Sequence, residues 1–297
     1  MNILGIDIGG SKIAAGIIDE NGNVLHCVNE RLPAGTTADS LLRTIQEKCG
    51  ILAAEYDFEK IGATIPGLAD AENGIWVYAP FSGINNFPIA AKLGGIYNKR
   101  VFIENDVNAC AVGEKRFGCC KDIDDFIWIT VSNGIGGSVF TSGKLYTGCG
   151  GNAGEIGHIK VVAGDGEFLC GCGDYGCAEA VAAGPGIAKR YNKLTNAALT
   201  AEQIAAQARA GDADAQKIMR ETGYYVGKAL AAAINMLNPA AVIFGGGVSQ
   251  SFDLLEPGLR DALSKYMFKA ANKDVKLMQT ALAYNAALIG AAAITMT

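Results

Sequence analysis

Three cysteines and one histidine form the most specific chemical pattern in this sequence. Cys170, Cys172 and Cys177 stand close together, and His158 precedes the first of them by twelve residues. Zinc takes thiolate and imidazole ligands in tetrahedral geometry, and four such ligands close its coordination sphere. Because glycines flank the cysteines, the loop can wrap an ion. We therefore expect a structural zinc site here, with a set of reduced, metal-free thiols as the alternative.

Glycine-rich segments follow three apolar runs, at Gly9-Gly10, Gly136-Gly137 and Gly245-Gly247. Backbone N–H groups without neighbouring side chains can cradle phosphate oxygens. Asp7, just before the first segment, can hold Mg²⁺ directly or through water. The spacing is not that of a Walker A loop, so a tight hairpin at each segment is the alternative. The sequence 8–11 matches the sequence 135–138, which indicates an internal duplication.

Carboxylates stand at three further positions that could carry chemistry. Glu104-Asn105-Asp106 follows an apolar run and opens a helical pattern, which is where α/β sheets place ligand contacts. Glu155 lies three residues before His158, and Glu179 lies two residues after Cys177. Rigid carboxylates suit hydrogen bonding to several hydroxyls, as in a sugar. The alternatives are that Asp106 only caps the helix 107–116 and that the two glutamates are solvated surface acids.

Strands and helices of an α/β protein must position these groups. Apolar runs and turn residues predict strands at 2–7, 12–19, 24–31, 61–65, 101–104, 126–131, 139–141, 144–146 and 241–244. Apolar spacing near 3.6 predicts helices at 38–55, 89–97, 107–116, 214–237 and 281–296, the first with Thr36 or Thr37 as its N-cap. Asn21-Gly22 between two apolar runs predicts a hairpin.

Composition excludes several classes of protein. The 297 residues carry a net charge of −5 without clustered Lys or Arg, which argues against binding to nucleic acid. No apolar run reaches the length of a membrane span, and the first residues lack the features of a signal peptide. In the reducing compartment that this implies, the crowded Cys170, Cys172 and Cys177 indicate a metal site and not disulfides. We expect a cytoplasmic protein that does not bind membranes.

Together these motifs resemble the ROK family (repressors, open reading frames and sugar kinases), a branch of the actin/hexokinase superfamily. The resemblance covers nearly the whole chain, and the Cys-rich element with Glu155–His158 before it is its most specific part. It implies a duplicated actin-like (ribonuclease H-like) α/β fold with two mixed-sheet halves and an interdomain cleft. The expected halves are residues 1–115 and 116–282, with a helix at 283–297 that packs back on the first. It also implies a homodimer.

The resemblance further implies ATP-dependent phosphorylation of a hexose or N-acylhexosamine at O6, with Mg²⁺ and structural zinc; glucose and N-acetylmannosamine lead among the substrates. Asp106 would be the catalytic base. Sugar contacts would come from Gly67, Asn105, Asp106, Glu155, His158 and Glu179. Phosphate and nucleotide contacts would come from Asp7, Gly10, Ser11, Lys12, Asn133, Gly134, Gly136, Gly137 and Gly246. Zinc would be bound by His158, Cys170, Cys172 and Cys177.

Two segments depart from the family pattern. Ser132-Asn133-Gly134 replaces a common Gly-Thr-Gly, and Pro80–Asn86 replaces a common Pro-Asn, so Asn85 or Asn86 would have to supply that sugar contact. Two alternatives to a kinase stay open. A repressor of the same family would carry a helix-turn-helix domain ahead of the first glycine turn, and because Asp7 is the seventh residue here, we expect no such domain. A catalytically idle sugar-binding relative would retain the fold without turnover.

Overall fold

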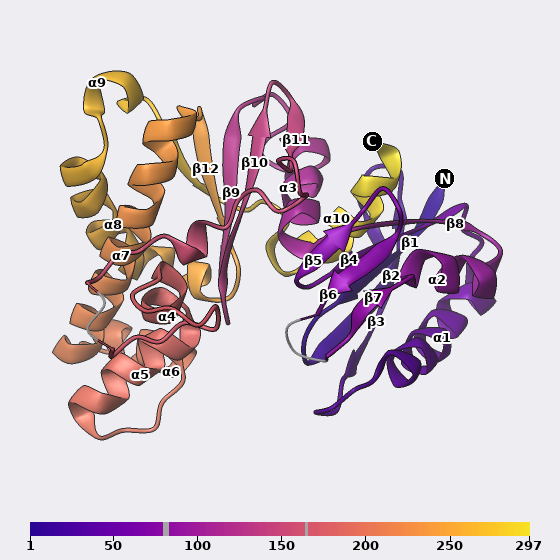
Figure 1. Cartoon of the computed structure of the whole chain (residues 1–297), viewed down its shortest axis with the longest axis horizontal. Helices are drawn as coiled ribbons and strands as arrows, with labels where there is room; N and C mark the ends of the chain where they lie inside the picture. Colours follow the sequence, from indigo (N-terminus) through magenta and orange to yellow (C-terminus); the bar gives the residue numbers. More distant parts are fainter. Residues whose placement is uncertain (80–82, 164–165) are drawn as a thin grey trace. The chain divides into compact units, whose positions relative to one another are not determined.

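The computed structural model describes residues 1–79, 83–163 and 166–297, and the chain divides into two compact units (Figure 1). The first unit comprises Met1–Asp124, Leu145–Ala153 and Thr280–Thr297; the second comprises Asp125–Lys144 and Gly154–Gln279. The sequence placed the first boundary after residue 115. In the structure the ammonium of Lys115 binds the carbonyls of Lys121 and Ile123, which keeps this segment on the first unit.

A five-stranded mixed sheet forms the centre of the first unit. Its strands, in the order β3-β2-β1-β4-β8, are β1 (Asn2–Ile8), β2 (Lys12–Asp19), β3 (Val24–Arg31), β4 (Lys60–Ile65) and β8 (Arg100–Asn105). The first three form an antiparallel meander, and β4 and β8 add in parallel. The hairpin expected at Asn21-Gly22 joins β2 to β3.

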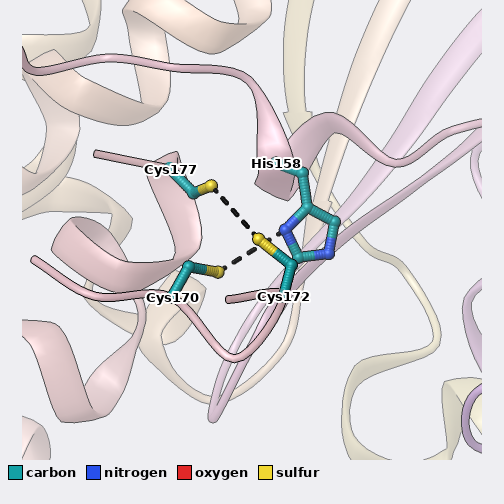
Figure 2. A group of neighbouring side chains, drawn as sticks. All are labelled: His158, Cys170, Cys172 and Cys177. Carbon is teal, nitrogen blue, oxygen red and sulfur yellow. Dashed lines mark hydrogen bonds between the residues drawn. The ribbon is translucent and has the colours of Figure 1, made fainter. Parts of the chain in front are cut away.

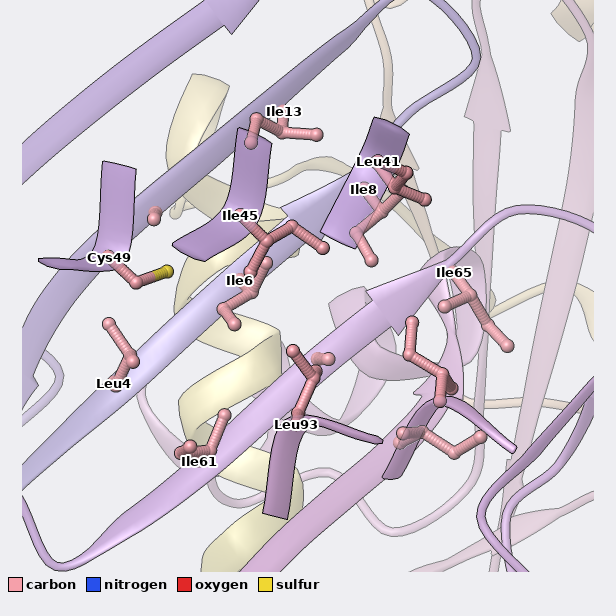
Figure 3. Close-up of a cluster of buried hydrophobic side chains, with 14 of the residues drawn as sticks. Leu4, Ile6, Ile8, Ile13, Leu41, Ile45, Cys49, Ile61, Ile65 and Leu93 are labelled. Carbon is pink, nitrogen blue, oxygen red and sulfur yellow. The ribbon is translucent and has the colours of Figure 1, made fainter. Parts of the chain in front are cut away.

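Alternate residues of β1 face two different layers of helices. Leu4, Ile6 and Ile8 point toward α1 (Ala38–Glu55), as Figure 3 shows, and α2 (Ile89–Tyr97) completes that core. On the other face, α10 (Ala286–Ala293) packs on β1 and β4. A Cβ at Gly5 would lie 2.9 Å from the carbonyl oxygen of Leu288, so α10 rests directly on the backbone of the sheet.

The second unit repeats this sheet. Its strands, in the order β11-β10-β9-β12-β13, are β9 (Phe126–Val131), β10 (Ile135–Thr141), β11 (Lys144–Tyr146), β12 (Ala241–Gly245) and β13 (Lys276–Gln279). Of the edge strand β11, only Lys144 falls within the second unit as defined above. As in the first unit, the central strand has one antiparallel and one parallel neighbour. The two equivalent strand orders agree with the internal duplication expected from the sequence.

One strand begins earlier than the sequence indicated. Gly136 and Gly137 were expected in a turn, but both lie within β10, where Gly136 pairs with Thr130 and Gly137 with Ile129. The turn itself is shorter and comprises Ser132–Gly134. Gly137 is buried because the 154–156 segment packs on it: a Cβ there would lie 2.7 Å from the carbonyl oxygen of Gly154.

Helices surround the second sheet, and a small sheet joins the first unit. The helices are α4 (Ala178–Ala182), α5 (Gly184–Thr195), α6 (Ala201–Arg209), α7 (Ala213–Leu237), α8 (Phe252–Tyr266) and α9 (Lys269–Asn272). The small sheet consists of β5 (Leu68–Asp70), β6 (Ile75–Tyr78) and β7 (Asn85–Phe87). In the described part of the chain no helix combines the length and the apolar character that crossing a membrane requires.

A buried carboxylate binds the chain where it leaves the first unit and where it returns. Glu114, on α3 (Asp106–Arg116), accepts hydrogen bonds from the N–H groups of Cys119 (2.9 Å) and Leu282 (3.3 Å) and from the hydroxyl of Thr280. Its side chain has no exposed surface. These donors satisfy the carboxylate in place of water, as a buried charge requires.

Candidate functional site

Asp106 is the first residue of α3, at the carboxyl end of β8 (Arg100–Asn105). The capping role belongs to its neighbour: Oδ1 of Asn105 accepts hydrogen bonds from the N–H groups of Val107 (2.9 Å) and Asn108 (3.2 Å). Oδ1 of Asp106 also accepts from Val107, at 3.0 Å. With the cap supplied by Asn105, the Asp106 carboxylate has acceptor capacity left for a ligand.

The surroundings of Asp106 raise the pKa of its carboxyl group toward neutral pH. Burial raises the pKa of Asp106 to about 7, and the negative charge of Asp7 adds to the shift. A general base works best when its pKa lies near the operating pH. The electrostatics of this pair therefore suit proton transfer at neutral pH.

Asp7 is held by the neighbouring strand. Asp7 and Thr64 are paired residues of the parallel strands β1 and β4, and the Thr64 hydroxyl donates a 2.8 Å hydrogen bond to Oδ1 of Asp7. Burial raises the pKa of Asp7, while this hydrogen bond and the charge of Lys12 act against the shift. Thr64 was not among the expected site residues. The available signal was a hydroxyl inside an otherwise apolar strand.

The first glycine turn borders a cavity of the first unit. The N–H of Gly9 donates to the carbonyl of Lys12 (2.8 Å), and the chain at Gly10, Ser11 and Lys12 is exposed. Gly9–Ser11 lines a cavity of about 340 Å³ together with the 32–36 loop and Trp76. Exposed backbone beside a cavity is the arrangement expected of a phosphate-binding turn.

Asn105 also connects to the Pro66-Gly67 segment, since its Nδ2 donates a 3.0 Å hydrogen bond to the carbonyl of Gly67. Behind it, Oε1 of Glu104 accepts from the backbone N–H of Asn105 (2.9 Å) and from Nδ2 of Asn108 (3.1 Å). Of the candidate sugar-contacting amides, Asn85 is exposed and donates to the carbonyl of Gly83 at 3.0 Å. The neighbouring residues 80–82 lie outside the described residues.

The four expected metal ligands lie together in the second unit (Figure 2). One nitrogen of His158 and the sulfurs of Cys170, Cys172 and Cys177 all lie within 4.8 Å of one another. Nδ1 of His158 is 3.5 Å from the Cys170 sulfur, and the sulfurs of Cys172 and Cys177 are 3.7 Å apart. Three sulfurs and one imidazole nitrogen form a donor set that fits tetrahedral zinc.

The two glutamates near this cluster have different partners. Glu155 is exposed to solvent in part, and its Oε2 lies 3.6 Å from Nε2 of His158, the ring nitrogen turned away from Cys170. A carboxylate in this position orients a metal-binding imidazole. Glu179, on α4, accepts a 3.0 Å hydrogen bond from the backbone N–H of Ile135 through Oε2, a contact that sequence reasoning did not anticipate.

The expected site residues divide between the two units. The first unit contains Asp7, Gly10, Ser11, Lys12, Gly67, Asn105 and Asp106. The second contains Asn133, Gly134, Gly136, Gly137, Glu155, His158, Cys170, Cys172, Cys177, Glu179 and Gly246. In the second unit Asn133 is exposed at the Ser132–Gly134 turn, and Gly246 adopts a φ of 89°, a conformation that favours glycine.

The sequence profile of the ROK family matches residues 3–297. The chain belongs to the ROK family. Its relatives include the glucokinase of Thermotoga maritima, 32% identical over 99% of this chain and 97% of that protein. Another ROK relative, the DNA-binding transcriptional dual regulator NagC of Escherichia coli, is 30% identical over 79% of this chain and 59% of its own length.

Solved structures confirm the fold of this ROK protein. A ROK family glucokinase from Streptomyces griseus, in complex with glucose and AMPPNP, matches with a TM-score of 0.87 and 31% identity over 99% of both chains. The actin-like α/β fold expected from the sequence is therefore confirmed. The glucokinase relatives support a sugar kinase, while regulators of similar identity also belong to this family.

Proposed function

We propose that this ROK protein is an ATP-dependent kinase that phosphorylates a hexose or N-acylhexosamine at O6, with glucose and N-acetylmannosamine as the leading substrates. One observation carries the proposal: Asp106 stands at the carboxyl end of β8, an edge strand of the first sheet, with its pKa raised to about 7 by burial and by Asp7. A full-length glucokinase relative and a glucokinase structure bound to glucose and AMPPNP support the reaction class.

Asp106 would accept the proton of the sugar hydroxyl as that oxygen attacks the γ-phosphate. Phosphoryl transfer depends mainly on alignment and on neutralising charge on the transferring group. Mg²⁺, when bound with the nucleotide, supplies part of that neutralisation, and Asp7 is the carboxylate we assign to it. Asn105 keeps Asp106 at the start of α3, because its own side chain caps the helix and binds the Gly67 carbonyl.

We assign the sugar hydroxyls to Glu155, His158 and Glu179 in the second unit and to Asn105 and Gly67 in the first. The nucleotide phosphates are assigned to the first glycine turn and to the two turns in the second unit, at the exposed Asn133 and the half-buried Gly134 and Gly246. Gly136 is assigned to the same region, whereas Gly137 is buried beneath the 154–156 segment and supports it by packing.

The metal in the Cys₃His cluster is proposed to be structural zinc. The four ligands leave no open coordination position, so the ion would fix the loop and take no part in proton transfer. Lys160 supports the charge of this set, because its ammonium lies 3.3 Å from the Cys177 sulfur. Elemental analysis of protein purified without chelators is expected to find about one zinc per chain.

A homodimer is proposed through exposed apolar side chains of the second unit. Met236, at the end of α7, is 84% exposed, and Phe268, just after α8, is 66% exposed. The two segments are joined, since the N–H of Phe268 donates to Oδ1 of Asn235 at 2.8 Å. Sedimentation of the wild type and of Phe268→Glu tests this: the variant is expected to shift toward monomer.

A panel of hexoses and N-acylhexosamines, assayed with ATP by coupled ADP release, tests the function. A sugar-dependent rate that Asp106→Ala abolishes supports the kinase and names the substrate. The competing candidate is a catalytically idle sugar-binding relative, which the similarity to the regulator NagC favours. Calorimetric binding of a sugar without any ADP release across the panel would establish that candidate instead.

A further inference from the structure

The carboxylate of Glu179 lies between the metal cluster and the second glycine turn. Its Oε2 accepts the 3.0 Å hydrogen bond from the N–H of Ile135, the residue that ends the turn and begins β10. Its Oε1 lies 3.8 Å from the sulfur of Cys170. One side chain therefore contacts both a metal ligand and the backbone assigned to the nucleotide phosphates.

The turn receives a second hydrogen bond from the same stretch of chain. The N–H of Gly184, at the start of α5, donates to the carbonyl of Ser132 at 2.7 Å. Thus one bond holds each end of the turn, at Ser132 and at Ile135. Both come from the residues that follow Cys177, a metal ligand placed at the N-cap of α4.

Packing at Gly134 leaves no space between the turn and Glu179. A Cβ at Gly134 would lie 2.6 Å from Oε2 of Glu179. The φ of Gly134 is not in the left-handed region, so alanine there meets an obstacle in Glu179 and not in its own backbone. The absence of a side chain at Gly134 is what allows the carboxylate to reach Ile135.

We propose that Glu179 is a positioning residue through which the Cys₃His metal site holds the Ser132–Ile135 turn in the conformation that binds nucleotide. An ion bound to Cys177 fixes the start of α4 and with it Glu179, two residues later. Oε2 of Glu179 then stays on the N–H of Ile135, so the ion acts on the nucleotide turn through this one side chain.

Amide hydrogen exchange of the 132–137 segment tests the positioning without any substrate, so it is independent of the proposed kinase activity. Glu179→Ala should exchange about 10-fold faster there, as expected when a hydrogen bond to a charged group is lost. The exchange rate in Glu179→Gln, which retains an acceptor oxygen, should lie between those of the wild type and Glu179→Ala. Zinc chelation of the wild type should raise exchange in the same segment. AMPPNP affinity, measured by calorimetry without sugar, should decrease from the wild type to Glu179→Gln and further to Glu179→Ala, and zinc chelation of the wild type should also lower it.

Glu202→Gln is the matched control, because Glu202 is an exposed glutamate at the start of α6 in the same unit and has no hydrogen bond to the turn or to the Cys₃His set among the described contacts. It should leave exchange at 132–137 and AMPPNP affinity unchanged. Gly134→Ala disturbs the same contact through the turn, because its Cβ would lie 2.6 Å from Oε2 of Glu179. The double variant with Glu179→Ala should exchange no faster than Glu179→Ala alone. Unchanged exchange and unchanged AMPPNP affinity in Glu179→Ala would overturn the proposal. So would fully additive effects of the two substitutions.

If no form of the protein binds AMPPNP, the kinase assignment fails while the exchange data still decide the positioning role. If wild-type protein binds AMPPNP and zinc removal leaves both exchange and affinity unchanged, the metal's part in the proposal is rejected. Metal content is measured in every sample, so that a change in Glu179→Ala is credited to the side chain only where zinc is retained.

Discussion

The hydroxyl of Thr64, which has no exposed surface, donates a 2.8 Å hydrogen bond to Oδ1 of Asp7 on the adjacent strand. This bond favours the ionised form of Asp7, while burial raises the pKa of the same group. The charge of Asp7 in turn helps to raise the pKa of Asp106. A threonine that touches no expected substrate thus favours the ionised form of the carboxylate assigned to Mg²⁺.

Thr64→Val should reduce kcat/KM at pH 7 by about 10-fold, since a hydrogen bond to a charged group contributes roughly 1.5–3 kcal/mol. Without its donor, the pKa of Asp7 rises further, which disfavours the ionised form. Steady-state kinetics at pH 7 and pH 8.5 check this, with part of the loss recovered at the higher pH. Thr64→Ser retains the hydroxyl and should stay near wild type. An equal loss in the serine variant would point to packing instead.

Asp106→Ala should leave the fold intact and reduce turnover by roughly 10²–10⁴, the usual contribution of general-base catalysis. The Asn105 cap does not depend on the Asp106 side chain, so α3 should remain formed. Turnover is measured with the preferred sugar, and thermal unfolding serves as the control. A variant that retains more than about a third of wild-type turnover would show that Asp106 is not the base.

The pH dependence should follow the raised pKa of Asp106. Because the base must be ionised to accept a proton, kcat/KM should rise with pH through the region around 7. Stability should change in the opposite direction: the contribution of a group whose pKa is raised from 3.8 to about 7 is present below 3.8 and lost as pH rises through 7. Asp106→Asn should therefore melt higher than wild type at pH 8.5, and this advantage should vanish at acidic pH. An advantage of the same size at both pH values would contradict the shift.

Cys170→Ser or Cys177→Ser should lose the metal, lower the melting temperature and weaken sugar binding together. The cause is shared, because the loop carries both the ligands and Glu179. Metal content, thermal unfolding and calorimetry on the same preparation check the three effects. Cys149→Ser is the matched control, since this exposed cysteine lies outside the cluster. Wild-type protein that lacks any zinc would refute the assignment.

Glu155→Gln should weaken sugar binding about 10-fold while ATP affinity scarcely moves. The substitution preserves volume and removes only the charge that would accept hydrogen bonds from sugar hydroxyls. Sugar and ATP affinities are measured separately by calorimetry, with zinc content checked in each sample. Unchanged sugar affinity with zinc retained would make Glu155 a surface acid. Weakened ATP affinity with normal sugar binding would assign it to the nucleotide.

Local patterns in the sequence were sufficient for much of the scaffold. The helix Ala38–Glu55 was predicted with its bounds, and Thr37 is its N-cap, as the capping box with Ser40 shows. The strand predictions were incomplete where pairing with a neighbouring strand, and not the local sequence, decides the structure. Gly136-Gly137 is typical of a turn, yet pairing with β9 places it in a strand. The short strands β5, β7 and β13 carry little apolar signal of their own, whereas β6, with the sequence Ile-Trp-Val-Tyr, was missed despite its apolar pattern.

For the candidate site too, local sequence predicted some features, and contacts between distant segments decided the others. Residue types and spacing indicated the four metal ligands, which the structure brings within 4.8 Å of one another. The contacts of Thr64 with Asp7 and of Glu179 with Ile135 join residues 57 and 44 positions apart, so only the folded chain reveals them. Asp106 was weighed as a helix cap, but the rotamer that decides between Asn105 and Asp106 is not encoded in local sequence.

The position of α10 has a consequence for how the molecule is made. This helix covers the sheet of the first unit and packs on α3, whose first residue is Asp106, yet it is encoded after the whole of the second unit. During synthesis the second unit is therefore complete in sequence while the first still exposes one face of its sheet. Domains generally fold as they emerge, the N-terminal one first. Here the first unit lacks α10 until the whole of the second unit has been synthesised, so α3, with Asp106 at its start, gains the packing behind it only at the end of translation.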